Sequence, residues 1–501
     1  MTQHPLAAAD PRVGRFLVPV LITLELFSGI IQGWIVPLLG DIAGHYAVSG
    51  GAVSWVLTVG LLSSAVSVPL MVVLADRFGR QRLLVIAVVL SAGGSVLIAF
   101  APVFPLVLLG AVIQGPVAAC LPLEMALLKH FRPERANRVI GSLVGMLTIG
   151  VALGAVVGGL AMDAIGNLPV VQFLPAAVLV LYIPLVWSLV PRDQGDVTRS
   201  VDWIGATTLG IALIGIMYGL SEGPATGWTG VSVVLPLALG IVALVGFFIA
   251  ETRVPTPLVD IGALKGARIL PALVVGFLAA IALFGNQTPT VLYFTADPAS
   301  VGYGLGGSAG LAGVVYGATA LLSSLGAFLS YGIAKRIGAR FAVAAGCLLI
   351  AAGVGGMVLA PSDLAAVAAL GVLSAFGSGV VFGVLPGIVV ERAPETDAAS
   401  VSGVYNTTRT IGGALAGAFV ASVLAAVVLS TGGADAAAPA VPALGAFQII
   451  WAVFAVLNVV AALVALTLGR SDVDASASSS SAGPSADRTS PDAPLTIGAT
   501  S

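Results

Sequence analysis

The chain has 501 residues, of which 58% are hydrophobic and only 9% are charged, with a formal net charge of −2. Its mean hydropathy is +1.08. Soluble domains carry roughly a quarter charged residues. The composition therefore excludes a soluble enzyme or a nucleic-acid-binding domain and predicts an integral membrane protein that contacts the lipid bilayer over most of its length.

Fourteen apolar segments follow one another along the chain, each long enough to cross a hydrocarbon core of about 30 Å as a helix. The predicted spans are 16–39, 51–73, 83–101, 104–128, 138–161, 171–191, 203–221, 230–250, 270–294, 309–333, 341–360, 364–390, 402–428 and 443–468. The fold class is therefore an all-α polytopic membrane protein. Residues 470–501 are rich in Ser, Ala, Pro and Asp, which predicts a disordered tail.

The basic residues are distributed asymmetrically. Of the 21 Lys and Arg residues, all but Arg409 belong to a terminus, an even-numbered loop or a span end beside one, and Arg409 lies in the part of its span that is nearer to an even-numbered loop; the odd-numbered loops carry none. Because basic residues are retained on the cytoplasmic side, we expect both termini, 1–15 and 470–501, in the cytoplasm and the protein in the plasma membrane. Arg outnumbers Lys by 18 to 3, which favours a GC-rich bacterial source.

Two short motifs recur about 260 residues apart. Ala-Asp-Arg-Phe-Gly at 75–79 reappears in form at 334–338, and Thr-Ile-Gly at 148–150 reappears at 410–412. A repeat at nearly constant spacing predicts a duplicated six-helix unit. The predicted halves are 16–191 and 270–468, in the same orientation, with an inserted helix pair at 203–250. Parallel repeats of this kind are typical of transporters with a central cavity.

Glu25 lies near the middle of span 16–39. A charge at that depth costs about 3 kcal/mol on insertion scales, and removal of water favours the neutral carboxyl. A Glu that is neutral when buried and ionised when wetted could carry a proton between two conformations. The alternative is a structural Glu that stays protonated or hydrogen-bonded.

Two other ionisable residues lie within predicted spans. We expect Glu124, near the inner end of span 104–128, to extend toward Lys129 and Arg132. Arg409 lies about two turns inside span 402–428, and polar neighbours such as Asn406 could hydrate it. Arg409 could support a gate, pair with a carboxylate, neutralise an anionic substrate or extend to the cytoplasm.

The loop Asp-Arg-Phe-Gly-Arg-Gln-Arg at 76–82 resembles the signature that the major facilitator superfamily carries between helices 2 and 3. The glycines of the fifth span resemble the signature of its fourteen-helix drug:proton antiporter branch: Gly141, Gly150, Gly154, Gly158 and Gly159. Segments 201–205 and 406–413 are also similar to that branch. The resemblance implies two six-helix bundles that rock about a central site, with an inserted helix pair, and usually a monomer.

The resemblance also implies roles for residues at the cytoplasmic face. Asp76 follows a helix C-terminus, where the dipole disfavours an anion, so it needs basic partners. In the family, this cluster latches the two halves in the outward-open state; the alternative is that it only anchors the loop in the cytoplasm. The expected latch or gate residues are Asp76, Arg77, Gly79, Arg80, Arg82, Lys335, Arg336 and Arg409. The helix 5 glycines are expected to allow close packing between the halves.

Polar side chains in the first and ninth spans are expected to face the substrate cavity or to hydrogen-bond between helices. A Gln of the fourth span, which matches the family's helix 4 signature, and an Asn of span 402–428 are added to this set. The candidate substrate-cavity residues are Gln32, Trp34, Gln114, Asn286, Gln287 and Asn406. Cys120 and Cys347 fall inside spans and are expected to pack as small apolar residues. The three histidines lack metal-ligand spacing, so no metal or cofactor is expected.

The sequence departs from the branch at three positions. Ala111 stands where the helix 4 signature has Arg, Ala155 stands where the helix 5 signature has Pro, and Glu25 lies about one turn from the usual carboxylate. We expect a secondary transporter that couples export of small molecules or drugs to protons. The departures leave open a metabolite exporter, uniporter or symporter without proton antiport, and a lipid flippase remains a weaker alternative. A membrane enzyme is not expected, because no catalytic cluster is present.

Overall fold

A computed structural model describes residues 11–132, 136–193, 195, 202–227, 229–251, 253–254, 269–359, 362–392, 398–429 and 441–468. Within these residues the regular structure is helical, apart from one isolated antiparallel bridge between Val428 and Pro442. The predicted tail, 470–501, and most of the predicted N-terminal segment, 1–15, lie outside the described residues.

Thirteen helical segments of the described residues are long and apolar enough to cross a membrane. The one remaining predicted span, 203–221, corresponds to α9, a helix of 24 residues whose apolar stretch, Trp203–Ile216, is shorter. All fourteen predicted spans therefore coincide with helices. The first span is formed by α1 (Pro11–Trp34), η1 (Val36–Leu38) and α2 (Leu39–His45) together, and the fourth by α5 (Phe104–Gln114), η2 (Gly115–Ala119) and α6 (Cys120–Phe131) together. The second, third, fifth and sixth spans are each one helix: α3 (Gly50–Phe78), α4 (Arg80–Ala99), α7 (Ala136–Ile165) and α8 (Leu168–Leu189).

The remaining spans follow the same order along the chain. They are formed by α9 (Trp203–Thr226), α10 (Val231–Glu251), α11 (Leu270–Gly285) and α12 (Gln287–Thr295), α14 (Ala309–Ile337), α15 (Ala339–Gly356) and η4 (Met357–Leu359), α16 (Leu364–Arg392), α17 (Ala398–Ala426) and α18 (Leu444–Ala465). A short helix, α13 (Pro298–Val301), lies in the loop before α14.

Three spans that the sequence predicts as single helices are interrupted. The first changes to a 3₁₀ turn that contains Pro37, and the fourth changes at Gly115 and Pro116. The ninth is divided at Asn286, three residues before Pro289. Proline lacks the N–H that would continue the helical ladder, which accounts for an interruption near each of these residues.

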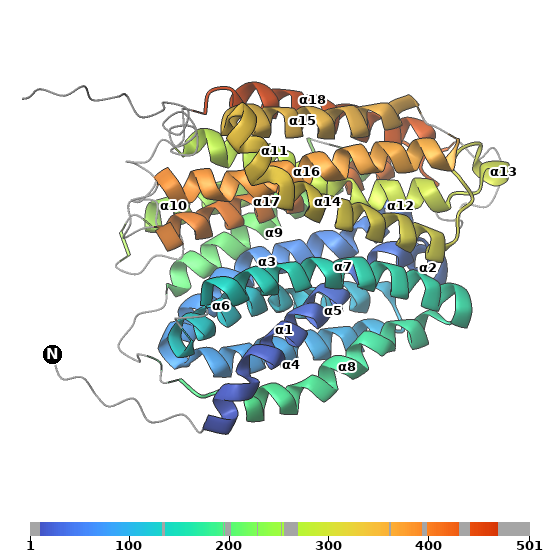
Figure 1. Cartoon of the computed structure of the whole chain (residues 1–501). Coiled ribbons are helices and arrows are strands. Elements are labelled where there is room, and N and C mark those ends of the chain that lie inside the picture. Colours follow the sequence, from blue (N-terminus) through green and yellow to red (C-terminus); the bar gives the residue numbers. More distant parts are fainter. Residues whose placement is uncertain are drawn as a thin grey trace, which may run out of the picture.

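Packing within the N-terminal helices is repeated within the C-terminal helices. In the first group α1 packs on α7, and in the second α11 packs on α17. The pairs α4 with α8 and α15 with α18 repeat in the same way. Figure 1 shows the two groups, the first coloured blue to green and the second yellow-green to red.

The two groups contact each other through equivalent helices. The fifth span of the first group, α7, packs on α14, while its counterpart α17 packs on α3. The inserted α9 packs against α3 and α17, and α10 packs against α9. Most of the surface of α10 remains exposed and apolar, as expected for a helix that faces lipid.

We name the two ends of the helices by their charged residues. The basic end carries the turns at Gly79 and Gly338, which end α3 and α14 with φ values of +99° and +90°. Backbone of this kind is readily adopted only by glycine, and it occurs at the same place in both copies of the repeated motif. The acidic end carries Asp41 in α2 and Asp163 near the end of α7.

Candidate functional site

Glu25 on α1 is buried inside the N-terminal group of helices, with 1% of its surface exposed. Apolar side chains of the same core, including Leu21 and Leu24, precede it on α1. Its Oε2 atom is buried and has no hydrogen-bond partner among the described residues. A carboxyl group in such surroundings is poorly stabilised as an anion.

Glu124 on α6 is also fully buried, with 0% of its surface exposed. The expectation that it extends toward Lys129 and Arg132 is wrong. Glu124 shares a helix face with Leu127 and Leu128, and this face packs into the core. Its short stem therefore cannot reach the basic end, and neither carboxyl oxygen has a hydrogen-bond partner in the described part of the chain.

The two buried carboxyl groups lie close enough to interact electrostatically with each other. The Cys120 thiol, one turn before Glu124, lies within the field of both. Tyr182 on α8 interacts with Glu124, and its hydroxyl shares a hydrogen bond with Thr23 Oγ1 on α1. Three helices thus bring a small polar group together inside an apolar core. Both cysteines are buried and free, as expected.

The loop at the basic end has a hydrogen-bonded structure. Arg80 Nη2 lies 3.5 Å from Asp76 Oδ1. The backbone N–H groups of Arg80 and Gln81 donate to Asp193, at 2.9 and 3.0 Å. Asp193 therefore caps the N-terminus of α4, where the helix dipole favours an anion. Sequence reasoning did not identify Asp193, because its partners lie more than a hundred residues earlier in the chain.

The other expected latch residues lie around the same end. The Arg77 guanidinium lies 5.3 Å from the ring centre of Phe78. The side chain of Arg82 is exposed, as are those of Lys335 and Arg336 in the last turn of α14.

Arg409 on α17 is partly buried rather than fully extended into solvent. Its guanidinium carbon lies 5.4 Å from the ring centre of Phe382 on α16, and it also interacts with Tyr405. The Nε atom is buried without a hydrogen-bond partner among the described residues. The aromatic contacts place the cation against the C-terminal helices.

The glycines of α7 form two contact faces. A methyl group added at Gly150 would lie 2.2 Å from the Leu26 carbonyl oxygen, and one at Gly154 would lie 2.1 Å from that of Ile30. Gly158 similarly faces Trp34, so three of the expected glycines pack on α1 of the same half and not between halves. Of the expected glycines whose contacts are described, only Gly159, about 100° further round the helix than Gly158, faces the other half.

An added methyl group at Gly159 would lie 2.3 Å from the Ala309 carbonyl oxygen of α14. The expectation of packing between the halves therefore applies to this glycine and not to the Gly150, Gly154 and Gly158 face. Gly141 lies in the second turn of α7, and its surroundings are outside the described contacts.

Two of the expected cavity residues hydrogen-bond to other helices of their own half. Gln114 Nε2 donates to Ser95 Oγ at 2.7 Å, and Asn286 Oδ1 accepts from Trp451 Nε1 at 2.9 Å. Trp34 and Gln114 line one small cavity of about 10 Å³. A volume of this size holds about one water molecule.

The remaining expected cavity residues are more accessible. The exposed Gln32 donates to the Ser28 carbonyl at 3.3 Å, and Gln287, at the start of α12, is half-buried. Asn406 on α17 is exposed.

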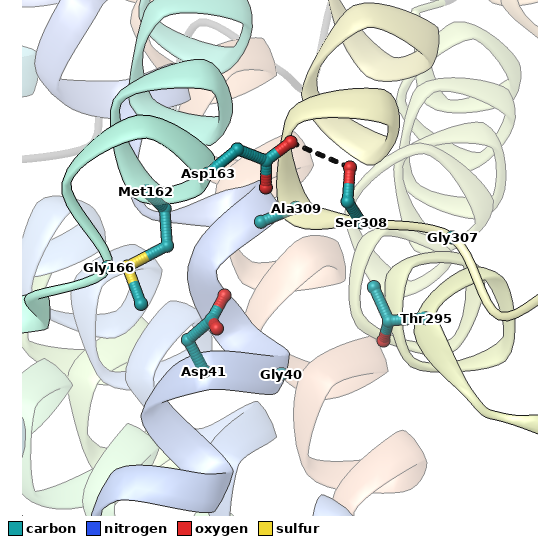
Figure 2. Close-up of a pocket in the computed structure, with 9 residues that line it drawn as sticks. All are labelled: Gly40, Asp41, Met162, Asp163, Gly166, Thr295, Gly307, Ser308 and Ala309. Atoms are coloured by element: carbon teal, nitrogen blue, oxygen red, sulfur yellow. Dashed lines mark hydrogen bonds between the residues drawn. The ribbon is translucent and has the colours of Figure 1, made fainter.

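At the acidic end, Asp163 joins α7 to α14. Its Oδ2 accepts a hydrogen bond from Ser308 Oγ at 2.7 Å, and its Oδ1 accepts one from Gly310 N at 3.1 Å. Figure 2 shows this contact beside a cavity of about 510 Å³. The cavity is lined by Gly40, Asp41, Met162, Asp163, Gly166, Thr295, Gly307, Ser308 and Ala309.

Two repeated groups of six helices with a helix pair between them form the fold of a membrane transporter. The family model described as "Major Facilitator Superfamily" matches residues 21–417. The chain therefore belongs to the major facilitator superfamily.

Known proteins similar to this chain include two that are named for drug resistance and a solved transporter structure. "Multidrug resistance protein Stp" of Mycobacterium tuberculosis is 28% identical over 437 residues, covering 83% of this chain and 77% of the relative. "Tetracenomycin C resistance and export protein" of Streptomyces glaucescens is 26% identical over 389 residues, with 75% and 69% covered. The structure of the POT family transporter PepTSo superposes with a TM-score of 0.63 at 14% identity, covering 90% of this chain and 97% of that one.

Proposed function

We propose that this protein exports small molecules across the plasma membrane by alternating access and that inward movement of protons drives the export. The observation that carries the proposal is Glu25, a buried carboxyl with an unpartnered oxygen in the first spanning helix of a major facilitator protein. Relatives named for drug resistance and export support small molecules as the cargo and export as the direction.

The proposed cycle uses the cost of burying a charge. Glu25 takes a proton from water on the outer side, which neutralises the carboxyl and permits the conformation in which it is enclosed. When the site opens to the cytoplasm, water stabilises the anion, the proton leaves and substrate binds. One proton crossing 100 mV supplies about 2.3 kcal/mol, enough to hold a roughly 50-fold concentration gradient of a neutral solute.

The two halves, 16–191 and 270–468, are proposed to rock as units, with 203–250 beside them and both termini in the cytoplasm. The contacts of α7 with α14 and of α3 with α17 support this division, because equivalent helices of each half form them. The close glycine contacts between halves, at Gly51, Gly159 and Gly313, lie toward the acidic end. This conformation is therefore proposed to be closed on the outer side, with Asp76, Arg80 and their basic neighbours forming the inner latch in the opposite state.

The test is proton movement in proteoliposomes that contain the purified monomer and an internal pH dye. Ethidium and tetracenomycin C, the latter named in a relative, serve as the first probes for export and binding. Addition of a transported probe should move protons in the direction opposite to the probe. The Glu25→Gln variant should lower that proton flux at least tenfold, while the amount of protein in the membrane is unchanged. Transport without any change of internal pH in the unmodified protein would reject proton coupling.

A second candidate is export or facilitated diffusion without protons. It is favoured by Ala111, which is buried at 4% exposure where the related antiporters carry Arg. A small apolar side chain at that position cannot stabilise a carboxylate. The same pH measurement separates the candidates, because only the first predicts proton movement that depends on the probe.

A further inference from the structure

The second buried carboxyl, Glu124, is not explained by packing alone. It is enclosed by the N-terminal core, and both of its oxygens lack hydrogen-bond partners among the described residues. An unpaired buried carboxylate costs several kcal/mol, so a position that needs only to fill space would be better occupied by Leu or Met. The arrangement suggests a function for its proton.

Glu25 and Glu124 lie on two helices that pack together, α1 and α6, and the two carboxyl groups interact electrostatically. Ionisation of one carboxyl makes ionisation of the other less favourable, and two such groups then titrate as one unit. The pair is therefore suited to hold a proton in the enclosed state and to lose it only when water reaches the site.

No basic side chain of the described residues offsets the pair. The titratable groups beside it are the Cys120 thiol and the Tyr182 hydroxyl. The charged residues on the helices that pack against α1 and α6 lie at helix ends: Lys129 and His130 end α6, Asp76 and Arg77 end α3, Arg80 and Arg82 begin α4, Arg138 begins α7 and Asp163 ends it. Lys129 and His130 are exposed. A proton is therefore the available means of neutralising the pair.

We propose that Glu124 is a second proton-binding carboxyl and that Glu25 and Glu124 form one proton-coupling unit. This inference rests on the proposed function, since it extends the proton site to a second residue. An O–H bond forms on a carboxyl oxygen of the pair with a proton from water on one side. That bond breaks when the proton passes to water on the other side, and no electrons are transferred.

The polar neighbours of the pair have a supporting role. The Tyr182 hydroxyl lies on α8 and its hydrogen bond with Thr23 on α1 fixes it near Glu124. Because α1, α6 and α8 all belong to the N-terminal half, 16–191, rocking of the halves keeps these groups together while it changes the access of water to both carboxyls. Opening of the transporter can thereby change the proton affinity of the unit.

The first test compares Glu25→Gln, Glu124→Gln and the double variant in the proteoliposome proton assay with ethidium. We expect each single variant to lower probe-driven proton flux at least tenfold, and we expect the double variant to be no worse than either single variant. Glu222→Gln, on the inserted helix α9, is the matched carboxyl control and should retain the flux of the unmodified protein. Size-exclusion profiles and thermal unfolding show whether each variant is folded.

The second test measures the proton on Glu124 without transport. An apolar carbodiimide modifies protonated carboxyls in membranes, and peptide mass spectrometry of the purified protein reports modification of Glu124 as a function of pH. In Glu25→Gln the neighbouring negative charge is gone, so Glu124 should lose its proton, and hence its labelling, at lower pH. The change follows from electrostatic coupling between the two sites.

The outcomes separate the two proposals. If the unmodified protein moves protons but Glu124→Gln behaves as the unmodified protein does, the paired site is rejected and proton coupling stands. If neither the unmodified protein nor any variant moves protons, the proposed function fails, and the labelling profile decides separately whether Glu124 binds a proton. A labelling profile that is the same with and without Glu25 overturns the paired site, and a shift of that profile to lower pH supports it.

Discussion

The Asp163 carboxylate at the end of α7 accepts a hydrogen bond from Ser308 at the start of α14, across the boundary between the two halves, at 2.7 Å. The same carboxylate accepts a second hydrogen bond from Gly310 N. Exposed N–H groups at a helix N-terminus favour an anion, so Asp163 holds α14 through both its charge and its geometry. These contacts close the acidic end, which is the proposed outer side.

Replacement of Asp163 by Ala should therefore favour opening at the acidic end. Asp163 and Ser308 are both exposed, so the closed state is expected to lose about 1 kcal/mol of stability. That value corresponds to a roughly fivefold increase in the outward-open population. Spin labels at Ala164 and Ala299, which are exposed on either side of the contact, would report the change. Double electron–electron resonance should show a larger fraction of long distances between the two labels.

Ser308→Ala provides the matching variant on the other half, and Asp163→Asn keeps an acceptor while removing the charge. Asn should have a smaller effect than Ala, since it can still accept one hydrogen bond. Identical distance distributions in Asp163→Ala and the unmodified protein would show that the contact between Asp163 and Ser308 does not stabilise the closed state.

The glycines of α7 give a prediction about stability. Gly154→Ala would place a methyl group 2.1 Å from the Ile30 carbonyl oxygen, so α1 and α7 must move apart. Overpacking of this kind typically costs about 1–3 kcal/mol. Thermal unfolding of the purified protein should show a lower midpoint for Gly154→Ala.

Gly145 is the control on the same helix, because an added methyl group there would meet nothing within 4 Å. Gly145→Ala should be neutral or slightly stabilising, since Ala has the higher helix propensity. Equal midpoints for the two variants would show that the contact between α1 and α7 relaxes without cost.

The cap on α4 can be tested independently. Asp193→Ala removes both acceptors from the N–H groups of Arg80 and Gln81. Loss of a helix cap costs about 0.5–2 kcal/mol, so hydrogen exchange in the first turn of α4 should be faster. Asp297→Ala, which removes the cap of the four-residue helix α13, should leave exchange in α4 unchanged. Unaltered exchange at Gln81 in Asp193→Ala would rule out a stabilising cap.

The spans could be predicted because lipid contact and charge retention leave local signals in the sequence. Every predicted span coincides with a helix, and the turns at Gly79 and Gly338 fall within the repeated motif. The interruptions were not predicted, because a single Pro such as Pro289 is tolerated inside some membrane helices, including α3, which contains Pro69 without a break.

The candidate site was only partly predictable, for a different physical reason. Depth in the membrane can be counted along the chain, and this identified Glu25. The direction of a side chain around the helix axis depends on neighbouring helices, and depth alone therefore misplaced Glu124. Asp163 and Asp193 act on partners far away in the sequence, so only the folded arrangement shows their roles.

The last prediction concerns Asn286, for which the sequence allowed either substrate binding or hydrogen bonding between helices. Its Oδ1 accepts from the Nε1 atom of Trp451, a fully buried side chain, at 2.9 Å. Asn286→Ala leaves that N–H without its acceptor, which should cost about 1–3 kcal/mol. Trp451→Phe removes the donor, so adding Asn286→Ala to it should cost less than in the unmodified protein. A double-mutant cycle on thermal unfolding should therefore give a coupling energy of about 1 kcal/mol. Additive effects on unfolding, together with weaker ethidium binding in Asn286→Ala alone, would instead assign Asn286 to the substrate site.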